Sequence, residues 1–257
     1  MDHLYRVNID GRNCYAIERD GTWRELDGDL FGAYETGTEL DRAVARLLPP
    51  VMPSKIVAVG LNYRDHAMEM GKALPSEPLI FLKPSTAVVG PEEPIVIPSG
   101  AGRVDHEAEL GIVIGRTARH VPAACAYDYV LGLTCVNDVT DRDLQARDVQ
   151  YTRGKGFDTF APIGPAIAVG LDGSALDVES SVNGESRQGS NTRELIFSLE
   201  LLVEFVTSVM TLLPGDIIAT GTPSGVGPLV AGDRVVVKVE GVGELANDVV
   251  TAEGGVR

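Results

Sequence analysis

The most informative chemical pattern in the sequence is a pair of acidic residues, Glu107 and Glu109, at the start of an apolar run that ends at Gly115. The run is rich in β-branched residues, which predicts a strand. Because side chains two residues apart on a strand share one face, both carboxylates should point the same way. Their repulsion is relieved by a shared proton, an arginine or a divalent cation such as Mg²⁺. A solvated strand face with two charges is the alternative interpretation.

A second polar segment follows another apolar strand, predicted over residues 130–136. Asp138 comes directly after this strand and is well placed to complete a cation site. Further on, Arg142 can bind a carboxylate through two hydrogen bonds, and Lys155 places a compact positive charge beside glycines. These are the local cations that an anionic ligand would need. The alternative for Arg142 is an ion pair on the surface of an exposed helix. We expect surface ion pairs of this kind for Arg147 and Asp148.

His66 and Glu69 lie three residues apart in a helix predicted over residues 65–70 and ended by Gly71. Two interpretations stay open for this pair. It is either a local ion pair on an exposed turn, or a base oriented by a carboxylate so that it can deprotonate water. A short segment bounded by a glycine is also where a mobile lid would be placed.

A glycine-rich turn over residues 221–227 follows a short apolar strand at 217–220. Its backbone N–H groups and the Thr222 hydroxyl could hold a carboxylate. The turn lacks the Gly-Lys-Ser/Thr ending of a phosphate-binding loop, and no helical pattern follows it.

The surrounding elements are mostly short strands. Residues 1–50 are expected to form a small β-rich N-terminal domain, with a helix over residues 39–48 that ends at two prolines, and residues 51–257 to form the larger domain. The longest amphipathic helix is predicted over residues 198–213. Its inward side chains should be Leu201, Leu202, Phe205 and Val209.

Composition excludes several classes of partner. The formal net charge of −15 argues against nucleic acid, whose phosphates would be repelled. No run of about 18 apolar residues predicts a membrane span. The three cysteines form no C-x-x-C pair, and the first residues lack the apolar run of a signal peptide. We therefore expect a soluble, cytoplasmic protein.

Taken together, these segments resemble the fumarylacetoacetate hydrolase family over roughly residues 50–250. Each motif is modest, and their fixed order makes the set specific. They are Asn-Tyr-Arg-Asp-His-x-x-Glu at 62–69, Phe-Leu-Lys-Pro at 81–84, Glu-x-Glu at 107–109, Asn-Asp-Val-Thr-Asp-Arg-Asp-Leu-Gln at 137–145, Lys-Gly-Phe-Asp-Thr-Phe at 155–160 and Gly-Thr-Pro-Ser-Gly-Val-Gly at 221–227. The first 50 residues match only loosely.

The resemblance implies an α+β, mostly β fold: a rolled mixed β-sheet catalytic domain with a small N-terminal domain, assembled as a homodimer. It also implies roles for individual side chains. The metal ligands for Mg²⁺ or Mn²⁺ would be Glu107, Glu109 and Asp138, with Thr159 in support. The residues that hold or polarise the substrate would be Arg142, Gln145, Lys155 and Thr222, and the dyad on a closing lid would be His66 and Glu69.

The activity implied by the resemblance is a family of related reactions on small anionic 2-oxo acids. The segment from Asp138 to Lys155 is shorter than in the eukaryotic hydrolases, so the chain looks more like the bacterial decarboxylase and isomerase branch. We expect metal-dependent C–C bond cleavage in a 2-oxo dicarboxylate or an acylpyruvate, in aromatic-acid catabolism. An isomerase of 2-hydroxyhepta-2,4-diene-1,7-dioate type substrates and a non-catalytic binding protein for metal and dicarboxylate are the alternatives.

Overall fold

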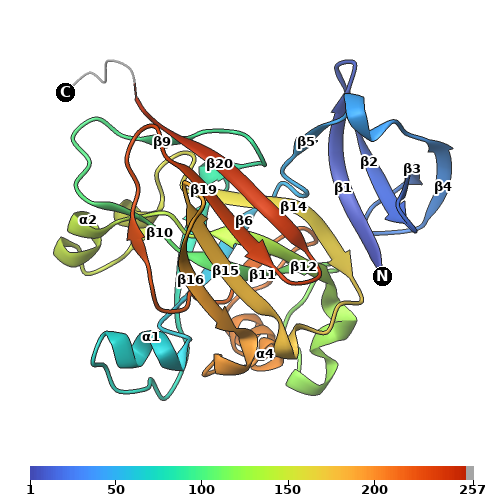
Figure 1. Ribbon diagram of the computed structural model, residues 1–257. Coiled ribbons are helices and arrows are strands. Elements are labelled where there is room, and N and C mark those ends of the chain that lie inside the picture. Colours follow the sequence, from blue (N-terminus) through green and yellow to red (C-terminus); the bar gives the residue numbers. More distant parts are fainter. Residues whose placement is uncertain (253–257) are drawn as a thin grey trace.

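Short strands dominate the computed structural model, which describes residues 1–252 (Figure 1). The largest sheet within that range has 12 strands, of which 10 form a continuous hydrogen-bonded path. In spatial order the path is β4 (Tyr34–Glu39), β3 (Thr22–Gly28), β2 (Arg12–Arg19), β1 (Asp2–Ile9), β14 (Ala161–Val169), β12 (Val130–Asn137), β11 (Ala108–Ile114), β17 (Ile217–Ala219), β6 (Lys55–Gly60) and β7 (Leu79–Pro84). The remaining two are β5 (Arg46–Leu48), paired with β1, and β8 (Val88–Val89), paired with β14.

Two smaller sheets and a few short helices complete the described part of the chain. The five-stranded sheet runs in the order β16 (Glu185–Asn191), β15 (Asp177–Val182), β19 (Arg234–Val239), β20 (Gly243–Thr251) and β9 (Ile95–Ile97). The three-stranded sheet consists of β13 (Thr140–Asp141), β10 (Val104–His106) and β18 (Gly227–Pro228). The α-helices are α1 (Arg64–Glu69), α2 (Arg142–Arg147), α3 (Thr152–Lys155) and α4 (Leu199–Val209). The 3₁₀ turns are η1 (Arg42–Val44), η2 (Ser85–Ala87), η3 (Ala123–Tyr129), η4 (Gly173–Ala175) and η5 (Thr192–Glu194).

The prediction of a mostly β fold with mixed strand pairing is confirmed. All seven residues of β11 are buried, because the main sheet is covered on both faces along this strand. Helix α4 packs on the same core through Leu202, as predicted, and through Val206. The expected inward positions of Leu201 and Val209 are wrong, since these side chains are 44% and 53% exposed. Nowhere in the described range is a helix long and apolar enough to cross a membrane.

The helix predicted over residues 39–48 is wrong. Asp41 instead caps the single 3₁₀ turn η1, and the next residues form β5, which pairs with β1. The physical reason is tertiary: Leu40 and Leu47 pack against the cluster around Trp23, and strand pairing satisfies the backbone that a helix would otherwise satisfy. Strand β1 also pairs with β14, so the N-terminal strands continue the main sheet (Figure 1).

Strand register brings distant polar segments to one edge of the main sheet. Ala108 pairs with Asn137, so the residue after β12 falls beside the residue before β11. Gly111 pairs with Ala219 on the other side of β11, so the turn after β17 reaches the same edge. Strand β6 runs parallel to β17 and ends there too, at Gly60, just before α1.

A candidate metal centre and active-site pocket

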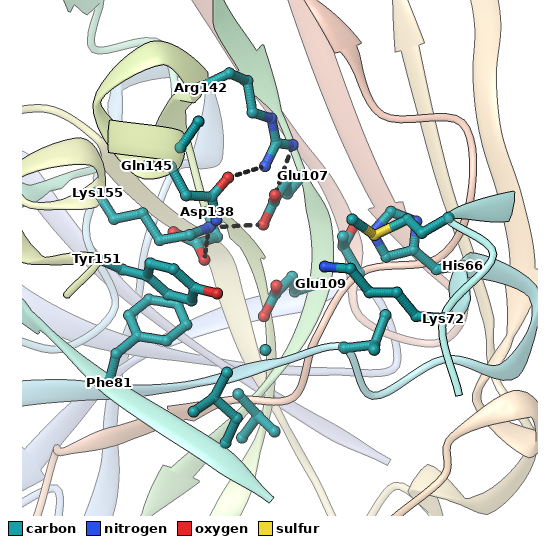
Figure 2. Close-up of a pocket in the computed structure, with 17 residues that line it drawn as sticks. His66, Lys72, Phe81, Glu107, Glu109, Asp138, Arg142, Gln145, Tyr151 and Lys155 are labelled. Carbon is teal, nitrogen blue, oxygen red and sulfur yellow. Dashed lines mark hydrogen bonds and ion pairs between the residues drawn. The ribbon is translucent and has the colours of Figure 1, made fainter. Parts of the chain in front are cut away.

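The polar segments at this end of the central strands surround a pocket of about 470 Å³ (Figure 2). Eight of the ten predicted site residues line it, Glu69 contacts one of those eight, and Thr159 lies outside the lining. The eight are His66, Glu107, Glu109, Asp138, Arg142, Gln145, Lys155 and Thr222.

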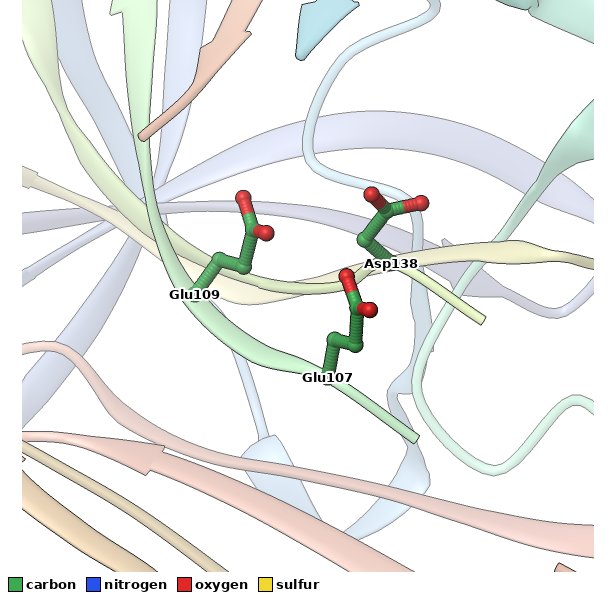
Figure 3. Close-up of side chains that lie close together, drawn as sticks. All are labelled: Glu107, Glu109 and Asp138. Atoms are coloured by element: carbon green, nitrogen blue, oxygen red, sulfur yellow. The ribbon is translucent and has the colours of Figure 1, made fainter. Parts of the chain in front are cut away.

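Three carboxylates meet inside this pocket (Figure 3). One oxygen from each of Glu107, Glu109 and Asp138 lies within 4.8 Å of the others, and all three residues are buried. The register of β11 and β12 fixes this arrangement, because the backbone N–H of Asp138 donates a 2.9 Å hydrogen bond to the carbonyl of Glu107. The two glutamates and Asp138, which follows the next strand, therefore lie together as predicted.

Lys155 neutralises two members of this triad from helix α3. Its ammonium lies 2.9 Å from Glu107 Oε2, 2.7 Å from Asp138 Oδ2 and 2.7 Å from Thr140 Oγ1. Burial by itself lowers the pKa of a lysine, but the two carboxylates outweigh it and raise the pKa of Lys155 above its ordinary value. This ammonium therefore stays charged beside the triad.

Arg142 lies on the other side of Glu107 and is held by α2. Its Nη2 lies 2.6 Å from Glu107 Oε1, and its Nε donates a 2.9 Å hydrogen bond to the buried carboxylate of Asp105. Its Nη1 donates to Gln145 Oε1 at 2.9 Å, three residues along the same helical face. Burial would raise the pKa of Glu107, but Lys155 and Arg142 together lower it to about 2.

Lys83, which belongs to the Phe-Leu-Lys-Pro motif but had no predicted role, is a buried partner of the triad. It is fully buried at the end of β7, where its ammonium forms a short ion pair with Asp138 Oδ1 and donates to the carbonyl of Val139. Burial is the main reason that the pKa of Lys83 is lowered, and the neighbouring Lys155 adds to this effect. The available signal was a lysine within an otherwise apolar strand, Leu-Ile-Phe-Leu-Lys-Pro.

Glu109 is different, because no cation within residues 1–252 pairs with it. Its carboxylate accepts a 2.9 Å hydrogen bond from the backbone N–H of Gly221 and faces the other two carboxylates. Burial, followed by the charges of Asp138 and Glu107, raises its pKa well above the ordinary value. An all-oxygen set of buried carboxylates, one of which has no paired cation among residues 1–252, fits a hard divalent cation such as Mg²⁺ or Mn²⁺. Glu107, Glu109 and Asp138, the predicted ligands, would hold this cation.

The glycine-rich turn holds a carboxylate, but that carboxylate belongs to the protein. Gly221 contacts Glu109, while the Thr222 hydroxyl donates a 2.9 Å hydrogen bond to the carbonyl of Ala108. The same hydroxyl accepts a 2.8 Å hydrogen bond from Nε2 of Gln188, a buried residue of β16. Because its one proton is already donated, Thr222 can only accept a hydrogen bond from a ligand.

Gln188 is a second residue missed from the sequence, where an isolated glutamine in an alternating strand gives no signal. Its Oε1 accepts hydrogen bonds from Ala108 N at 2.9 Å and from Ser180 Oγ at 3.0 Å. It also lies 3.1 Å from His106 Nδ1. Burial lowers the pKa of this histidine, which favours its neutral form. Gln188 thus ties the five-stranded sheet to the residue between the two glutamates.

Helix α1 places the predicted dyad at the pocket. His66 Nδ1 lies 3.0 Å from Glu69 Oε2, and the imidazole lines the pocket while the carboxylate lies behind it. The glycine turn holds that carboxylate, because Gly225 N–H donates to Glu69 Oε1 at 3.2 Å. A further anchor is the 2.6 Å hydrogen bond from Ser190 Oγ to Asp65 Oδ2. The helix is therefore docked over the pocket.

Thr159 lies outside the lining of the pocket, and several further residues complete that lining. The hydroxyl of Thr159 accepts a 2.8 Å hydrogen bond from the backbone N–H of Val96, and Thr159 is not among the lining residues. The lining residues for which no role was predicted are Val59, Gly60, Leu61, Met70, Lys72, Leu79, Phe81, Ala146 and Tyr151.

The chain is similar to known proteins in both sequence and fold. An uncharacterized protein of Archaeoglobus fulgidus is 53% identical over 233 residues, which cover 91% of this chain and 92% of that protein. The crystal structure of 5-carboxymethyl-2-hydroxymuconate delta-isomerase from Mycobacterium smegmatis is 45% identical, with a TM-score of 0.92 over 97% of this chain and 100% of that chain. The 2-hydroxyhepta-2,4-diene-1,7-dioate isomerase from Mycobacterium marinum is 43% identical, with a TM-score of 0.91 over 99% of this chain and 100% of that chain.

Family models match both parts of the sequence. Residues 3–50 match the Rv2993c-like N-terminal model. Residues 55–250 match the model of the fumarylacetoacetate hydrolase C-terminal domain, and this range contains every residue of the pocket. The chain belongs to the fumarylacetoacetate hydrolase family.

Proposed function

We propose that this protein is a divalent-metal-dependent enzyme that cleaves a C–C bond in a small 2-oxo dicarboxylate or acylpyruvate. The observation that carries the proposal is the buried triad of Glu107, Glu109 and Asp138 at one pocket with a buried ammonium, Lys155, and a histidine–carboxylate dyad. Mere binding of a metal and an acid does not need the histidine, whereas addition of water to a ketone does.

A bound cation would supply a chelation point for a 2-oxo acid and positive charge where its carbonyl oxygen becomes negative. Lys155 would add a fixed positive charge beside that oxygen, since Glu107 and Asp138 hold its ammonium in place. The Arg142–Gln145 pair would contact the carboxylate of the substrate. For loss of the carboxylate β to that carbonyl, as in oxaloacetate, stabilisation of the negative charge that develops on the carbonyl oxygen accounts for most of the chemistry.

Hydrolysis of an acylpyruvate needs a water molecule that attacks the distal ketone. With the proton of His66 on Nδ1 and donated to Glu69, Nε2 is the free base that can take a proton from that water. The Glu69 carboxylate would stabilise the imidazolium that forms, and Gly225 keeps this carboxylate in position. The dyad is thus required for hydrolysis and dispensable for decarboxylation.

Isomerisation of a 2-hydroxy-dienedioate is the second candidate. The specific observation that favours it is the similarity to two solved structures named as isomerases, at 45% and 43% identity. The same metal site and base would then move a proton between two carbons without breaking the carbon chain.

Pyruvate release tests the proposal. Oxaloacetate and acetylpyruvate are each supplied with excess Mg²⁺ or with EDTA, alongside a no-enzyme control for spontaneous decarboxylation of oxaloacetate. Pyruvate release that EDTA abolishes supports the cleaving enzyme, and the preferred substrate separates decarboxylase from hydrolase. If neither substrate yields pyruvate while metal is bound, the cleavage proposal fails, and conversion of a dienedioate to an isomer would support the second candidate.

A further inference from the structure

The pocket contains a cation that the protein itself does not neutralise. The side chains of Arg142 and Lys155 are both engaged with carboxylates of the site, and His66 is engaged with Glu69. Lys72 also lines the pocket, yet within residues 1–252 its ammonium has no hydrogen-bond or ion-pair partner. In a chain with net charge −15 and three carboxylates in this pocket, such a cation is available for an anionic ligand.

The backbone of Lys72 is fixed relative to the catalytic dyad. Helix α1 ends in a Schellman motif, in which Lys72 N–H donates to the carbonyl of Ala67 at 3.0 Å and Gly71 N–H donates to that of Met68 at 3.0 Å. Gly71 has φ of +62°, the left-handed conformation that this motif requires. Because α1 is docked on the glycine turn, Lys72 is carried to the pocket by the same element that carries His66.

Lys72 and the other two pocket cations lie on different sides of the metal ligands. In Figure 2, Arg142, Lys155 and Gln145 lie to one side of Glu109, while Lys72 and His66 lie to the other. Apolar side chains also line the pocket and would suit the carbon chain of a ligand. They are Val59, Leu61, Met70, Leu79 and Phe81.

We propose that Lys72 forms a second anion subsite, which binds the terminal carboxylate of a dicarboxylic 2-oxo acid. This inference rests on the proposed function, because the 2-oxo acid end is taken to bind beside the triad. The distal carboxylate then lies on the side of His66, so that the carbons between the two ends pass the imidazole. Lys72 would therefore select dicarboxylates over monocarboxylates of the same length.

A matched pair of non-hydrolysable ligands tests the subsite by binding instead of turnover. 2-Oxoadipate and 2-oxohexanoate share the 2-oxo acid end and the chain length, and they differ in a terminal carboxylate or methyl group. Calorimetric titration with Mg²⁺ present should give a Kd about fivefold lower for 2-oxoadipate in the wild type, as for a partly exposed ion pair. That preference should weaken as the ionic strength is raised.

Two variants isolate the contribution of Lys72. Lys72→Met should bring the ratio of the two Kd values close to one while leaving the Kd for 2-oxohexanoate within about twofold of wild type. Lys238→Met is the matched control, because Lys238 is an exposed lysine of β19 outside the pocket, and its loss changes the net charge equally. The control should keep the full preference.

The outcomes separate this inference from the proposed function. If both ligands bind in a Mg²⁺-dependent way and Lys72→Met leaves their ratio unchanged, the subsite is overturned while the metal-dependent site stands. The subsite is likewise overturned if Lys238→Met removes the preference as strongly as Lys72→Met. If neither ligand binds with or without Mg²⁺, the proposed function fails, and the subsite fails with it.

Discussion

The amide of Gln188 donates a 2.8 Å hydrogen bond to the hydroxyl of Thr222, and through it the five-stranded sheet supports strand β11. Thr222 in turn donates to the carbonyl of Ala108, while Gln188 Oε1 accepts from Ala108 N–H. Both polar backbone groups of the residue between Glu107 and Glu109 are therefore held by side chains from outside β11. The direction of the two glutamates depends on these contacts.

We predict that Gln188→Leu weakens binding of Mn²⁺ by about tenfold, because the peptide between the two glutamates loses its support. The matched control is Asn247→Leu, another buried amide, which donates to the carbonyls of Gly90 and Glu93 away from the pocket. Both substitutions should reduce the free energy of unfolding by about 1–3 kcal/mol. The measurement is Mn²⁺ binding followed by electron paramagnetic resonance, and equal affinities in the two variants would contradict a positioning role.

The raised pKa of Glu109 predicts a pH dependence with a definite sign. A carboxyl whose folded pKa lies above its ordinary value stabilises the metal-free fold below about pH 4.3, and that stability is lost as the pH rises toward the folded pKa. Glu107 acts in the opposite direction, since its pKa of about 2 means that its contribution is lost only in strong acid.

In EDTA we therefore expect Glu109→Gln to be more stable than wild type, by about 1 kcal/mol or more at pH 8, with a smaller difference at pH 5. With saturating Mg²⁺ the order should reverse, because the variant lacks one metal ligand. Thermal unfolding at both pH values, with EDTA and with Mg²⁺, measures this. A variant that is less stable in EDTA at pH 8 would show that the Glu109 carboxylate is not destabilising.

Loss of the His66–Glu69 dyad should reduce the rate of hydrolysis far more than the rate of decarboxylation. His66→Ala should reduce acetylpyruvate hydrolysis by about 10²–10⁴-fold, the usual contribution of a general base. Oxaloacetate decarboxylation should fall by less than tenfold, because no water needs to be activated. Steady-state kinetics on both substrates gives the comparison, with Glu69→Gln expected to follow the same pattern more weakly. Equal losses on both substrates would instead indicate a role for the histidine in binding.

Removal of the Lys83 ammonium should have a large effect on the free energy of unfolding. Removal of its fully buried ammonium leaves Asp138 with one cation instead of two, so Lys83→Met should cost about 3 kcal/mol of unfolding free energy in the metal-free protein. Lys238→Met removes an ion pair with Glu179 in which both side chains are 51% exposed, and should cost less than about 0.5 kcal/mol. Urea unfolding in EDTA compares the two. Similar small losses would mean that Lys83 contributes little to the buried network.

The sequence predicts the parts of the site that local pattern encodes. An apolar run preceded by two acids, and another followed by one, are enough to place Glu107, Glu109 and Asp138, because polar residues at strand ends interrupt clear runs. The short helix with its glycine stop is likewise visible in the chain. The structure adds that Glu107 lies just before β11, not within it.

The residues that were missed depend on pairing between distant segments. Lys83 and Asp138 are 55 positions apart, and Gln188 and Thr222 are 34 apart, so only the assembled sheets bring them into contact. The wrong helix over residues 39–48 has the same origin. Its charged and apolar residues fit a helical period, but the edge of β1 offers strand pairing and the cluster around Trp23 offers burial.

Glu107, Glu109 and Asp138 are proposed to bind one divalent cation. The most direct measurement is an anomalous difference map from a crystal grown with Mn²⁺, collected for the wild type and for Glu109→Gln. We predict one strong peak in the wild type, about 2.0–2.3 Å from an oxygen of each carboxylate, and a weaker or absent peak in the variant. A wild-type map without a peak among these three side chains, or an undiminished peak in the variant, would show that the three carboxylates are not the metal ligands.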